Sequence, residues 1–523
     1  MKDNEETKQV DDLLIAYKFP PMTDVGGIIL AKRALLTGKS YDVVHTEIQE
    51  PLDNDFNEII DEIINNRIII KNFEYGMSKK ELNETFNNYI TEGLKKLEDA
   101  NDNYKTITTR SWGVQPVFLA LEYKLNHPEC FWTAEFSDPL TVNIENKSRD
   151  KKFKLDNKDY ADRINKEIDR VNKEKNSKLE HIKEDDNIYL LCEYLAYVFA
   201  DKIRFINSNQ RYIMLKQCPY DVKDLVMGKS EIKSHPTLDE KYYHVKEVDY
   251  KVDEDCINIG YFGTYFGKRN FETIFYAYDN LNDDLKAKIK FHLFLNHGDN
   301  LKRLTSNLNM GKSLIVNNKV SLLEFLNLST KLDVLLVNDT ETKGNFEKNP
   351  YRPSKIADYL GSNNDIWGIC EKDSIMDSLE EIKYKSYIND YYSAKLVLNQ
   401  IIQDSDKIDD ELKTKPYKDE DLNDYSINYF NKNMDDLSKG DIEELINENM
   451  YLKGRTNHLN HLFNGTTGRG LFADEAKKLI SKNEKIEKEN EKLKKQNKKY
   501  KKELKYLKSS KGSLKYQIKK IIK

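Results

Sequence analysis

The sequence lacks the cysteine pattern of a disulfide-bonded or zinc-binding protein. Its 523 residues include five cysteines, which are scattered, odd in number and without a Cys-x-x-Cys pair. This usage argues against a disulfide framework and a structural zinc site, and it fits a reducing cytoplasm. The five are Cys130, Cys192, Cys218, Cys256 and Cys370.

Long hydrophobic runs are absent as well. The longest apolar stretch, residues 188–200, contains Glu193 and is shorter than the roughly 20 residues that a membrane-spanning helix needs. The first residues, MKDNEETKQVDD, are acidic and polar, unlike a secretory signal peptide. We therefore expect a soluble, cytoplasmic protein that could still dock as a peripheral protein on the inner face of the cell membrane.

Two familiar ligand motifs are missing or out of place. No Gly-x-Gly-x-x-Gly follows the first predicted strand, so a dinucleotide-dependent dehydrogenase is poorly supported. Asp53-Asn54-Asp55 has the Asp-x-Asp pattern of metal-dependent transferases, but it lies in a polar stretch that no strand precedes. We expect no metal site there.

The charge is distributed unevenly along the chain. The net charge is −5, but residues 475–523 contain 19 Lys against 6 Glu, a net +13, which leaves −18 for the rest. An acidic body argues against nucleic acid as the main partner. The basic tail would suit an acidic surface or an anionic membrane.

The tail has a heptad pattern that predicts a coiled coil over residues 475–523. Asn occupies the second core position of the first three heptads, and buried Asn fixes register and often selects a parallel dimer. We expect a homo-oligomer through residues 479–521; the alternative is a lone, solvated Lys-rich helix. Beyond Gly512 the last turns could lie on an anionic membrane, where each Lys contributes roughly 1 kcal/mol. The heptad positions are Leu479, Ile486, Leu493, Tyr500, Leu507, Leu514 and Ile521, followed four residues later by Asn483, Asn490, Asn497, Leu504, Lys511 and Ile518.

Ahead of the tail, two regions alternate short apolar runs with helical patterns. This alternation predicts an α/β fold with parallel sheets covered on both faces. The expected strands are residues 12–17, 41–45, 104–109, 131–136 and 202–207 in the first region, and 256–263, 289–295, 313–316, 332–337 and 366–369 in the second. The expected domains are residues 1–220, with a charged helical insertion at about 145–187, then 221–405, a helical region 406–474, and the tail 475–523; no strand is expected between 374 and 470.

The stretch PYRPSKIADYLG lies between two predicted strands and holds the most informative pattern. Pro353 suits the first turn of a helix, where its missing N–H would be unpaired anyway. Arg352, Ser354 and Lys355 lie at that helix start, where free N–H groups and the positive end of the dipole favour a phosphate. Asp358, one turn further on, could accept hydrogen bonds from sugar hydroxyls. The same letters also fit an ordinary helix N-terminus.

Two glycine-containing loops also follow predicted strands. Gly26 and Gly27 precede a helix, and paired glycines let backbone N–H groups approach a diphosphate. In GTYFGKRN, Gly263 and Thr264 end a strand, and the cations that follow could neutralise a leaving diphosphate. Those cations, Lys268 and Arg269, could equally be exposed basic residues before a helix.

A fourth loop, in FWTAEFSDPL, places carboxylates at a strand end. Glu135 and Asp138 are candidates for binding an acceptor or for acid–base chemistry. Asp138, which precedes Pro139, could equally cap a helix or start a turn.

Together these loops resemble those of GT-B glycosyltransferases, nearest to the retaining family 4 enzymes that build capsule, teichoic acid or lipid-linked glycans. FPPMTDVGG, WTAEFSDP, INIGYFGTYFGKRN and PSKIADYLGSNNDIWGI occur in the family's order, and the resemblance spans about residues 12–405. It implies two Rossmann-like parallel-sheet domains that face each other across a cleft. The N-terminal domain would bind the acceptor, and the C-terminal domain the nucleotide-sugar donor.

The resemblance also implies roles for individual residues. Lys268 and Arg269 would hold the donor diphosphate, and Asp358 would bind the ribose. The implied donor-binding residues are Gly26, Gly27, Gly263, Thr264, Lys268, Arg269, Ser354, Lys355 and Asp358; the implied catalytic residues are Asp138, Lys268 and Arg269. Two positions depart from the family, because Pro350 stands where a first glutamate is common and Ser137 where a histidine is common.

The resemblance implies an enzyme that moves a sugar from a nucleotide-diphosphate sugar to a cell-surface polysaccharide, lipid-linked or polymer acceptor. The reaction would be retaining and metal-independent, with the nucleotide sugar as co-substrate and no cofactor. Two alternatives stay open. One is a non-catalytic GT-B scaffold that assembles through the coiled coil; the other is a nucleotide-sugar epimerase of the same fold.

Overall fold

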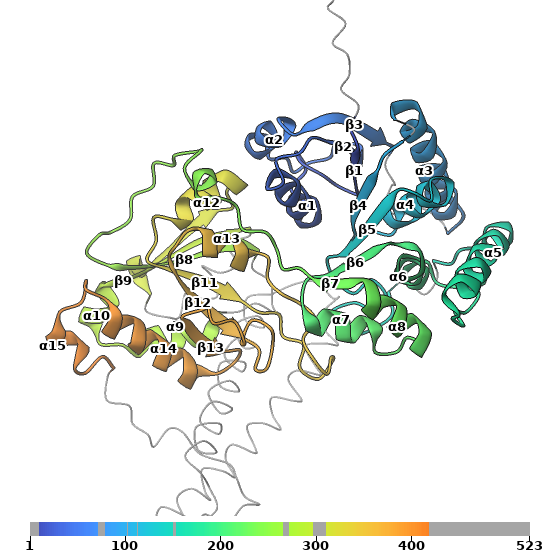
Figure 1. The fold of residues 1–523 in the computed structure, drawn as a ribbon. Helices are drawn as coiled ribbons and strands as arrows, with labels where there is room; N and C mark the ends of the chain where they lie inside the picture. Colours follow the sequence, from blue (N-terminus) through green and yellow to red (C-terminus); the bar gives the residue numbers. More distant parts are fainter. Residues whose placement is uncertain are drawn as a thin grey trace, which may run out of the picture. The chain divides into compact units, whose positions relative to one another are not determined.

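The computed structural model describes residues 10–71, 79–101, 103–111, 113–149, 153–264, 271–296 and 310–417. Two parallel β-sheets organise these residues (Figure 1). Lys268, Arg269 and the coiled coil expected over 475–523 lie outside the described residues. Within those ranges, none of the helices combines the length and the apolar character that crossing a bilayer requires.

The first sheet has seven strands in the order β3-β2-β1-β4-β5-β6-β7, and all of its pairings are parallel. Apolar, β-branched and aromatic runs form most of its strands, as expected of a sheet that is covered on both faces. The strands are β1 Asp12–Ala16, β2 Tyr41–Thr46, β3 Ile64–Ile70, β4 Thr106–Ser111, β5 Phe131–Phe136, β6 Lys202–Phe205 and β7 Ser230–Ile232.

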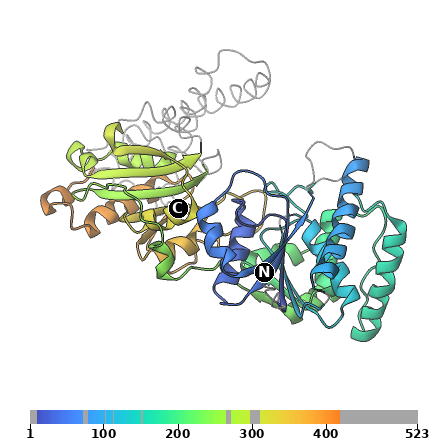
Figure 2. The same ribbon diagram turned by 90° about the horizontal axis from the view of Figure 1, so that it is seen from above.

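Helices cover both faces of this sheet. In Figure 1, α1 and α2 lie on one side of the strands and α3 and α4 on the other, and Figure 2 shows the same layering from above. The helices of this region are α1 Val25–Leu35, α2 Asn54–Asp61, α3 Lys79–Ala100, α4 Gln115–Asn126, α5 Lys158–Lys175, α6 Ile188–Phe199, α7 Ser208–Leu215, α8 Tyr220–Lys229 and the 3₁₀ helix η1 Glu240–Tyr243.

Large aromatic side chains fill the core of this first region. Tyr104, Tyr123 and Trp132 are fully buried around β4, α4 and β5, and each such burial stabilises the fold by roughly 2–3 kcal/mol. Within the charged stretch 145–187 the structure has the helix α5, which buries Ala161, Ile164 and Ile168 against the rest of the region.

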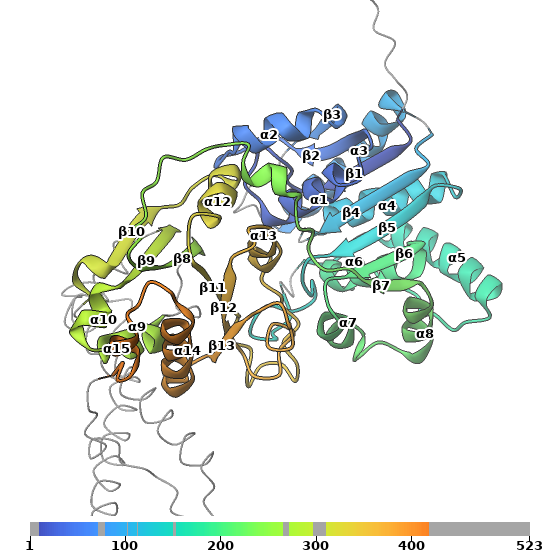
Figure 3. The same cartoon turned by 60° about the vertical axis from the view of Figure 1, so that its left-hand side comes forward.

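The second sheet has six strands in the order β10-β9-β8-β11-β12-β13 (Figure 3). The strands are β8 Ile257–Thr264, β9 Ile289–Asn296, β10 Leu314–Asn318, β11 Val334–Asn338, β12 Asp365–Cys370 and β13 Tyr384–Tyr387. The helices are α9 Glu272–Asp279, α10 Asp283–Ala287, the 3₁₀ helix η2 Gly311–Ser313, α12 Leu322–Ser329, α13 Lys355–Gly361, α14 Tyr391–Asp404 and α15 Asp410–Lys413. The two sheets confirm the predicted fold class, an α/β protein with two Rossmann-like parallel sheets.

Three strands depart from the sequence-based expectation. β13 contradicts the prediction that no strand lies beyond residue 374, because its sequence YKSY is too polar and short to stand out. β3 (INNRIII) is apolar only in its second half, and β7 (SEI) has three residues. All three are edge strands of their sheets, where a strand buries less apolar surface than in the centre.

The described residues pack into two compact units. One unit, here the N-terminal unit, contains the described residues up to Val252 together with Val320–Ile366 and Glu371–Lys383; the other contains those of Asp253–Lys319, Trp367–Cys370 and the residues from Tyr384 on. The N-terminal unit therefore includes α12 and α13, and α12 packs on α2 and η1. The candidate site described below lies within this unit.

Candidate functional site

Charged side chains stand where β4 and β5 end. Arg110 and Glu135 are partners in the parallel register of these two strands. Loops at the carboxyl ends of parallel strands are the usual place of ligand sites in such sheets. Arg110 and Glu135 therefore lie at the carboxyl ends of two central strands, the end of the sheet at which we expected the ligand-binding loops.

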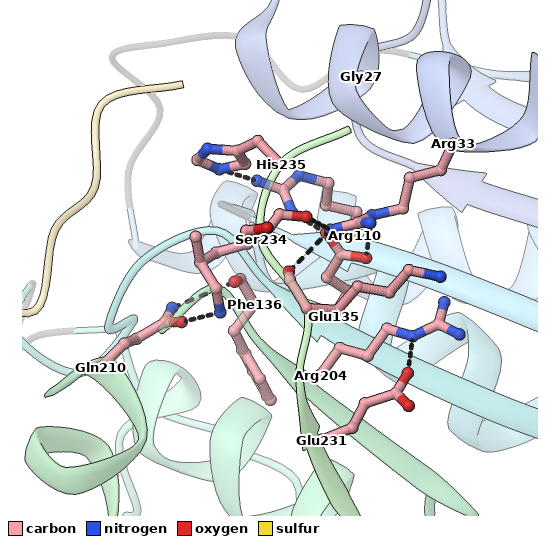
Figure 4. A network of polar contacts seen from close by, with 12 residues as sticks. Gly27, Arg33, Arg110, Glu135, Phe136, Arg204, Gln210, Glu231, Ser234 and His235 are labelled. Carbon is pink, nitrogen blue, oxygen red and sulfur yellow. Dashed lines mark hydrogen bonds and ion pairs between the residues drawn. The ribbon is translucent and has the colours of Figure 1, made fainter. Parts of the chain in front are cut away.

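Glu135 binds two arginines inside the protein (Figure 4). Its carboxylate forms an ion pair with Arg110 Nη1, and Arg33 Nε of α1 lies 3.1 Å from Oε1 and 2.8 Å from Oε2. The side chains of Arg110, Glu135 and Arg33 are 1%, 0% and 9% exposed. Two buried cations thus share one buried carboxylate, an arrangement that leaves one positive charge unmatched.

His235 completes this group. Its Nε2 lies 3.5 Å from Arg110 Nη2, and Arg33 Nη2 donates hydrogen bonds to the carbonyl oxygens of Lys233 at 3.0 Å and Ser234 at 2.8 Å. Figure 4 shows the imidazole beside the Arg110 guanidinium. We call Arg33, Arg110, Glu135 and His235 the arginine cluster; it fastens the segment after β7 to α1 and to the first sheet.

The surroundings of His235 are strongly positive. Burial lowers its pKa well below the usual value, and Arg110, Arg33, Arg352 and Lys32 lower it further. The ring is therefore neutral at pH 7. Because a guanidinium can only donate, Nε2 is the acceptor of the neutral ring and Nδ1 carries the proton.

The start of α1 holds both predicted glycines. Gly26 and Gly27 are buried in its first turn, and the Gly27 amide donates a 2.9 Å hydrogen bond to the N-cap residue Asp24. A Cβ at Gly27 would lie 2.2 Å from the carbonyl oxygen of Lys18. Glycine at this position therefore allows α1 to approach the loop after β1, whatever ligand the helix binds.

The last turn of α1 contacts Asp358, the residue predicted to bind the ribose. Lys32 Nζ lies 2.5 Å from Asp358 Oδ1 of α13, and these side chains are 4% and 8% exposed. The hydroxyl of Tyr243 donates to the backbone carbonyl of Asp358 at 2.5 Å. The structure thus brings the glycine-led helix together with the helix of the PSKIADYLG stretch, and it gives Asp358 a cationic partner that the sequence did not reveal.

A buried polar network supports the loop that leads into α13. Asn349 Nδ2 donates to Asp339 Oδ1 at 3.2 Å, to the Thr340 carbonyl at 2.9 Å and to Glu371 Oε2 at 2.9 Å, and its Oδ1 accepts the Tyr351 N–H at 2.9 Å. Burial raises the pKa of Asp339 to about 6 and also raises that of Glu371. This network fixes the approach to Arg352.

The predicted phosphate-binding residues follow in sequence. Ser354 precedes α13 with a helical backbone and no side-chain capping hydrogen bond, and Lys355 begins the helix. Both are half-buried, as is Arg352. The Ser354 hydroxyl is thus not used as a cap.

Asp138 lies on the loop after β5, half-buried beside Ser137. Its charge raises the pKa of Tyr351, after the larger effect of burial, so the loop after β5 lies near the loop before α13. Glu193 of α6 holds this loop, because its Oε1 accepts the amides of Leu140 at 2.6 Å and Thr141 at 2.9 Å.

The remaining predictions divide into two groups. Gly263 and Thr264 end β8 as expected, outside the N-terminal unit. Asp53, from the Asp-x-Asp pattern, caps α2 through the Phe56 amide at 3.2 Å and also accepts the Leu322 amide at 2.7 Å. Asp55 pairs with Lys246. These contacts give the pattern a structural role, and no group of three metal-ligating side chains occurs among the described residues.

The N-terminal unit therefore gathers three of the four predicted loops, with Gly26, Gly27, Asp138 and Asp358 among them. Sequence reasoning missed Lys32, Arg33, Arg110 and His235. The available signal for Arg110 was a charged residue at the end of the strand TITTRS, next in the sheet to FWTAEF with its Glu135.

Comparisons with known proteins show resemblance in solved structures alone. No protein-family model matches the chain, and no curated protein matches it. The chain is similar to Anabaena Alr3699/HepE in complex with UDP-glucose, with 9% identity over 76% of this chain and 91% of that one and a TM-score of 0.48.

Two further solved structures are similar to the same extent. Sucrose-phosphate synthase from Thermosynechococcus elongatus has 11% identity, covers 75% of this chain and 90% of its own, and gives a TM-score of 0.46. A putative UDP-N-acetylglucosamine 2-epimerase from Listeria monocytogenes has 9% identity, covers 79% and 93%, and gives 0.44. At these identities the likeness concerns the arrangement of strands and helices, and any function must be argued from the residues of this chain.

Proposed function

We propose that this protein is a glycosyltransferase that moves a sugar from a nucleotide-diphosphate sugar to a glycan, lipid-linked or other polymer acceptor. The main observation in favour of this proposal is the contact of Lys32 with Asp358. It joins the helix that starts at Gly26–Gly27 to the helix that follows Arg352–Ser354. A backbone suited to phosphates and a carboxylate suited to a ribose thereby belong to one compact unit.

In the proposed reaction the bond between the sugar C1 and the diphosphate oxygen breaks, and a bond from C1 to the acceptor oxygen forms. The acceptor hydroxyl would give its proton to Asp138, the candidate for acid–base chemistry, and the electron pair of the broken bond stays on the diphosphate. Lys268 and Arg269 would stabilise that developing charge, which is the largest demand of the step. Ser354 and Lys355 would contact the phosphates, Gly263 and Thr264 would line the donor loop, and Asp138 would face the acceptor.

The proposal needs no metal, because cations and backbone N–H groups can stabilise the leaving diphosphate. A retaining outcome and the family 4 type are part of the proposal. So is assembly through residues 479–521, which would present several sites to a repetitive acceptor and raise its effective concentration. A lower mass in light scattering after deletion of residues 475–523 would support that assembly.

The test is calorimetric titration of the full chain with UDP, GDP, CDP, ADP and NAD, with and without EDTA, followed by assay of the matching nucleotide sugars. We expect one nucleoside diphosphate to bind in the presence of EDTA. Lys268→Ala with Arg269→Ala should abolish turnover and leave the melting temperature unchanged. Lys312→Ala with Lys319→Ala, two exposed lysines of the same unit, is the matched control and should keep wild-type turnover.

The outcomes separate the alternatives. Wild-type turnover in the Lys268/Arg269 variant would remove the diphosphate assignment. Donor binding without turnover on any acceptor would favour the scaffold, and a changed sugar nucleotide formed from donor alone would favour an epimerase.

A further inference from the structure

The arginine cluster and its neighbours carry a surplus of positive charge. Arg33 and Arg110 share Glu135, and Lys32 pairs with Asp358. Arg352 adds a further cation, which makes no ion pair among the described residues; Glu381, which acts on it, is exposed. With His235 neutral, four cations have two carboxylates in ion pairs with them, Glu135 and Asp358. Asp24 acts on Arg110 and Glu381 on Arg352 only through longer-range attraction, so about two positive charges have no ion-pair partner of their own.

Two buried donors of this cluster also lack acceptors. Arg110 Nε and His235 Nδ1 have no hydrogen-bond partner among the described residues, although both atoms are shielded from solvent; the acceptor Glu135 Oε2 has none either and is shared only in the ion pair with Arg33. The Arg110 side chain is 1% exposed. A buried donor without an acceptor costs roughly 1–3 kcal/mol, and more when the group is charged. A bound water or a bound anion can supply the missing acceptor and offset that cost.

The ligand that satisfies both deficits has two negative charges and several acceptor oxygens. A phosphate group has both properties, whereas a carboxylate has one charge and a neutral sugar has none. The exposed residues 232–234 lie over the cluster, because Arg33 Nη2 holds the carbonyls of Lys233 and Ser234. Because the Arg110 side chain is 1% exposed, a ligand can reach it only if that segment moves.

We propose that the acceptor of this enzyme carries a phosphate group and that the arginine cluster, with Arg352, binds it. This inference rests on the proposed function, since it names the acceptor class of that enzyme. Arg33, Arg110, Glu135 and His235 belong to the first of the two sheet regions, whereas the cations assigned to the donor diphosphate, Lys268 and Arg269, follow β8 of the second sheet. We therefore assign the phosphate of the acceptor to the arginine cluster and the diphosphate of the donor to Lys268 and Arg269.

The test uses the full chain and three probes: inorganic phosphate, a hexose phosphate and acetate. Titration calorimetry is run with each probe, alone and with the nucleoside diphosphate that binds best. We expect phosphate and hexose phosphate to bind at least about tenfold more tightly than acetate, as one added charge-assisted hydrogen bond predicts. Saturating nucleoside diphosphate should leave that affinity unchanged.

Variants locate the phosphate. Arg352→Gln and His235→Asn should each weaken phosphate binding about tenfold or more. The His235 variant should leave nucleoside diphosphate binding unchanged, whereas Arg352 also lies just before the start of α13, where the donor phosphates are expected. Asn at 235 keeps an acceptor for Arg110, and the Arg352 side chain is not hydrogen-bonded to any described residue, so both variants should fold. Arg170→Gln on the exposed face of α5 is the matched control and should bind phosphate like the wild type.

Each result decides the matter. Phosphate that binds both variants as tightly as wild type, or phosphate binding no tighter than acetate, overturns the proposal. Competition between phosphate and nucleoside diphosphate also overturns it, because the cluster would then belong to the donor site. Phosphate binding that the two variants lose, in a chain that binds no nucleotide, supports the anion site and removes the donor assignment instead.

Discussion

Two buried glutamates of the N-terminal unit are held in opposite ways. Glu135 at the end of β5 faces two guanidinium groups. Glu193 on α6 contacts no Lys or Arg among the described residues, and accepts the Leu140 and Thr141 amides and, at 3.4 Å, the Tyr197 hydroxyl. The first carboxylate is outnumbered by cations, and the second has only dipoles.

The difference decides how each site responds to change. Removing the Glu135 charge leaves two buried cations facing each other, which is costly at any pH where proteins fold. At Glu193 the burial itself raises the pKa to about 7, against the lowering effect of the two amides. The folded protein therefore disfavours the charged form of Glu193, and its stability should change with pH.

Glu135→Gln should have the largest effect. It leaves Arg33 and Arg110 buried without a counter-charge, which costs about 3–5 kcal/mol. Hydrogen exchange of β4 and β5 amides measures this locally, in a chain whose two units need not unfold together. Glu129→Gln, an exposed neighbour, is the control. Unchanged protection in the Glu135 variant would mean that the ion pairs contribute nothing to stability.

Added phosphate sharpens that experiment. If the cluster binds phosphate, the anion should replace part of the missing charge and restore protection in Glu135→Gln more than in wild type. Equal effects of phosphate on the two proteins would separate the stability of the cluster from ligand binding.

The sequence predicts where Glu135 lies but not which residues it pairs with. FWTAEF reads as a strand, so the position of Glu135 at its end follows from the apolar run alone. Arg33 and Lys32 lie in the last turn of α1, where basic residues ordinarily complement the helix dipole. Their ion pairs with Glu135 and Asp358 depend on packing between segments 102 and 326 residues apart, and no local pattern contains that information.

The same reasoning explains which strands were missed. Apolar runs mark the central strands, since both faces are covered there. β13 lies at an edge and β7 has three residues, so neither needs a run that stands out. Gly26 and Gly27 were visible as a pattern, but the contact of Gly27 with Lys18 was not.

The ion pair of Lys32 and Asp358 is intermediate between the two glutamates in the number of cations, because one carboxylate has one cationic partner. Lys32→Met should cost about 3 kcal/mol, since it leaves one buried charge rather than two. The double variant Lys32→Met with Asp358→Leu should recover most of that loss, because both charges are then gone. Lys39→Met breaks an exposed pair with Asp12 and should cost less than about 1 kcal/mol. A double variant as unstable as the sum of the singles would show that the two residues do not act as a pair.

Glu193 gives the effect that depends most on pH. Because its pKa is about 7 when folded and near 4.5 in an unfolded chain, the folded state binds the extra proton between these values. Stability should therefore fall as pH rises from about 4.5 to 7, by roughly 3 kcal/mol, and then level off. Neighbouring Tyr197, Cys192 and Cys218 do not titrate in that window, since burial raises the pKa of each, that of Cys218 to about 11.

Glu193→Gln removes the proton and keeps an oxygen for the two amides. Its stability should therefore lack that part of the slope, exceeding wild type at pH 8 and matching it near pH 4.5. The free energy of unfolding, measured between pH 4.5 and 8 from exchange of α6 amides, gives the comparison, with Glu129→Gln as the variant that keeps the slope. Parallel curves for wild type and Glu193→Gln would mean that the amides of Leu140 and Thr141 hold the carboxylate charged throughout. In that case dipoles would match cations as partners for a buried carboxylate, and the contrast between the two glutamates would concern how many cations are present, not what holds the charge.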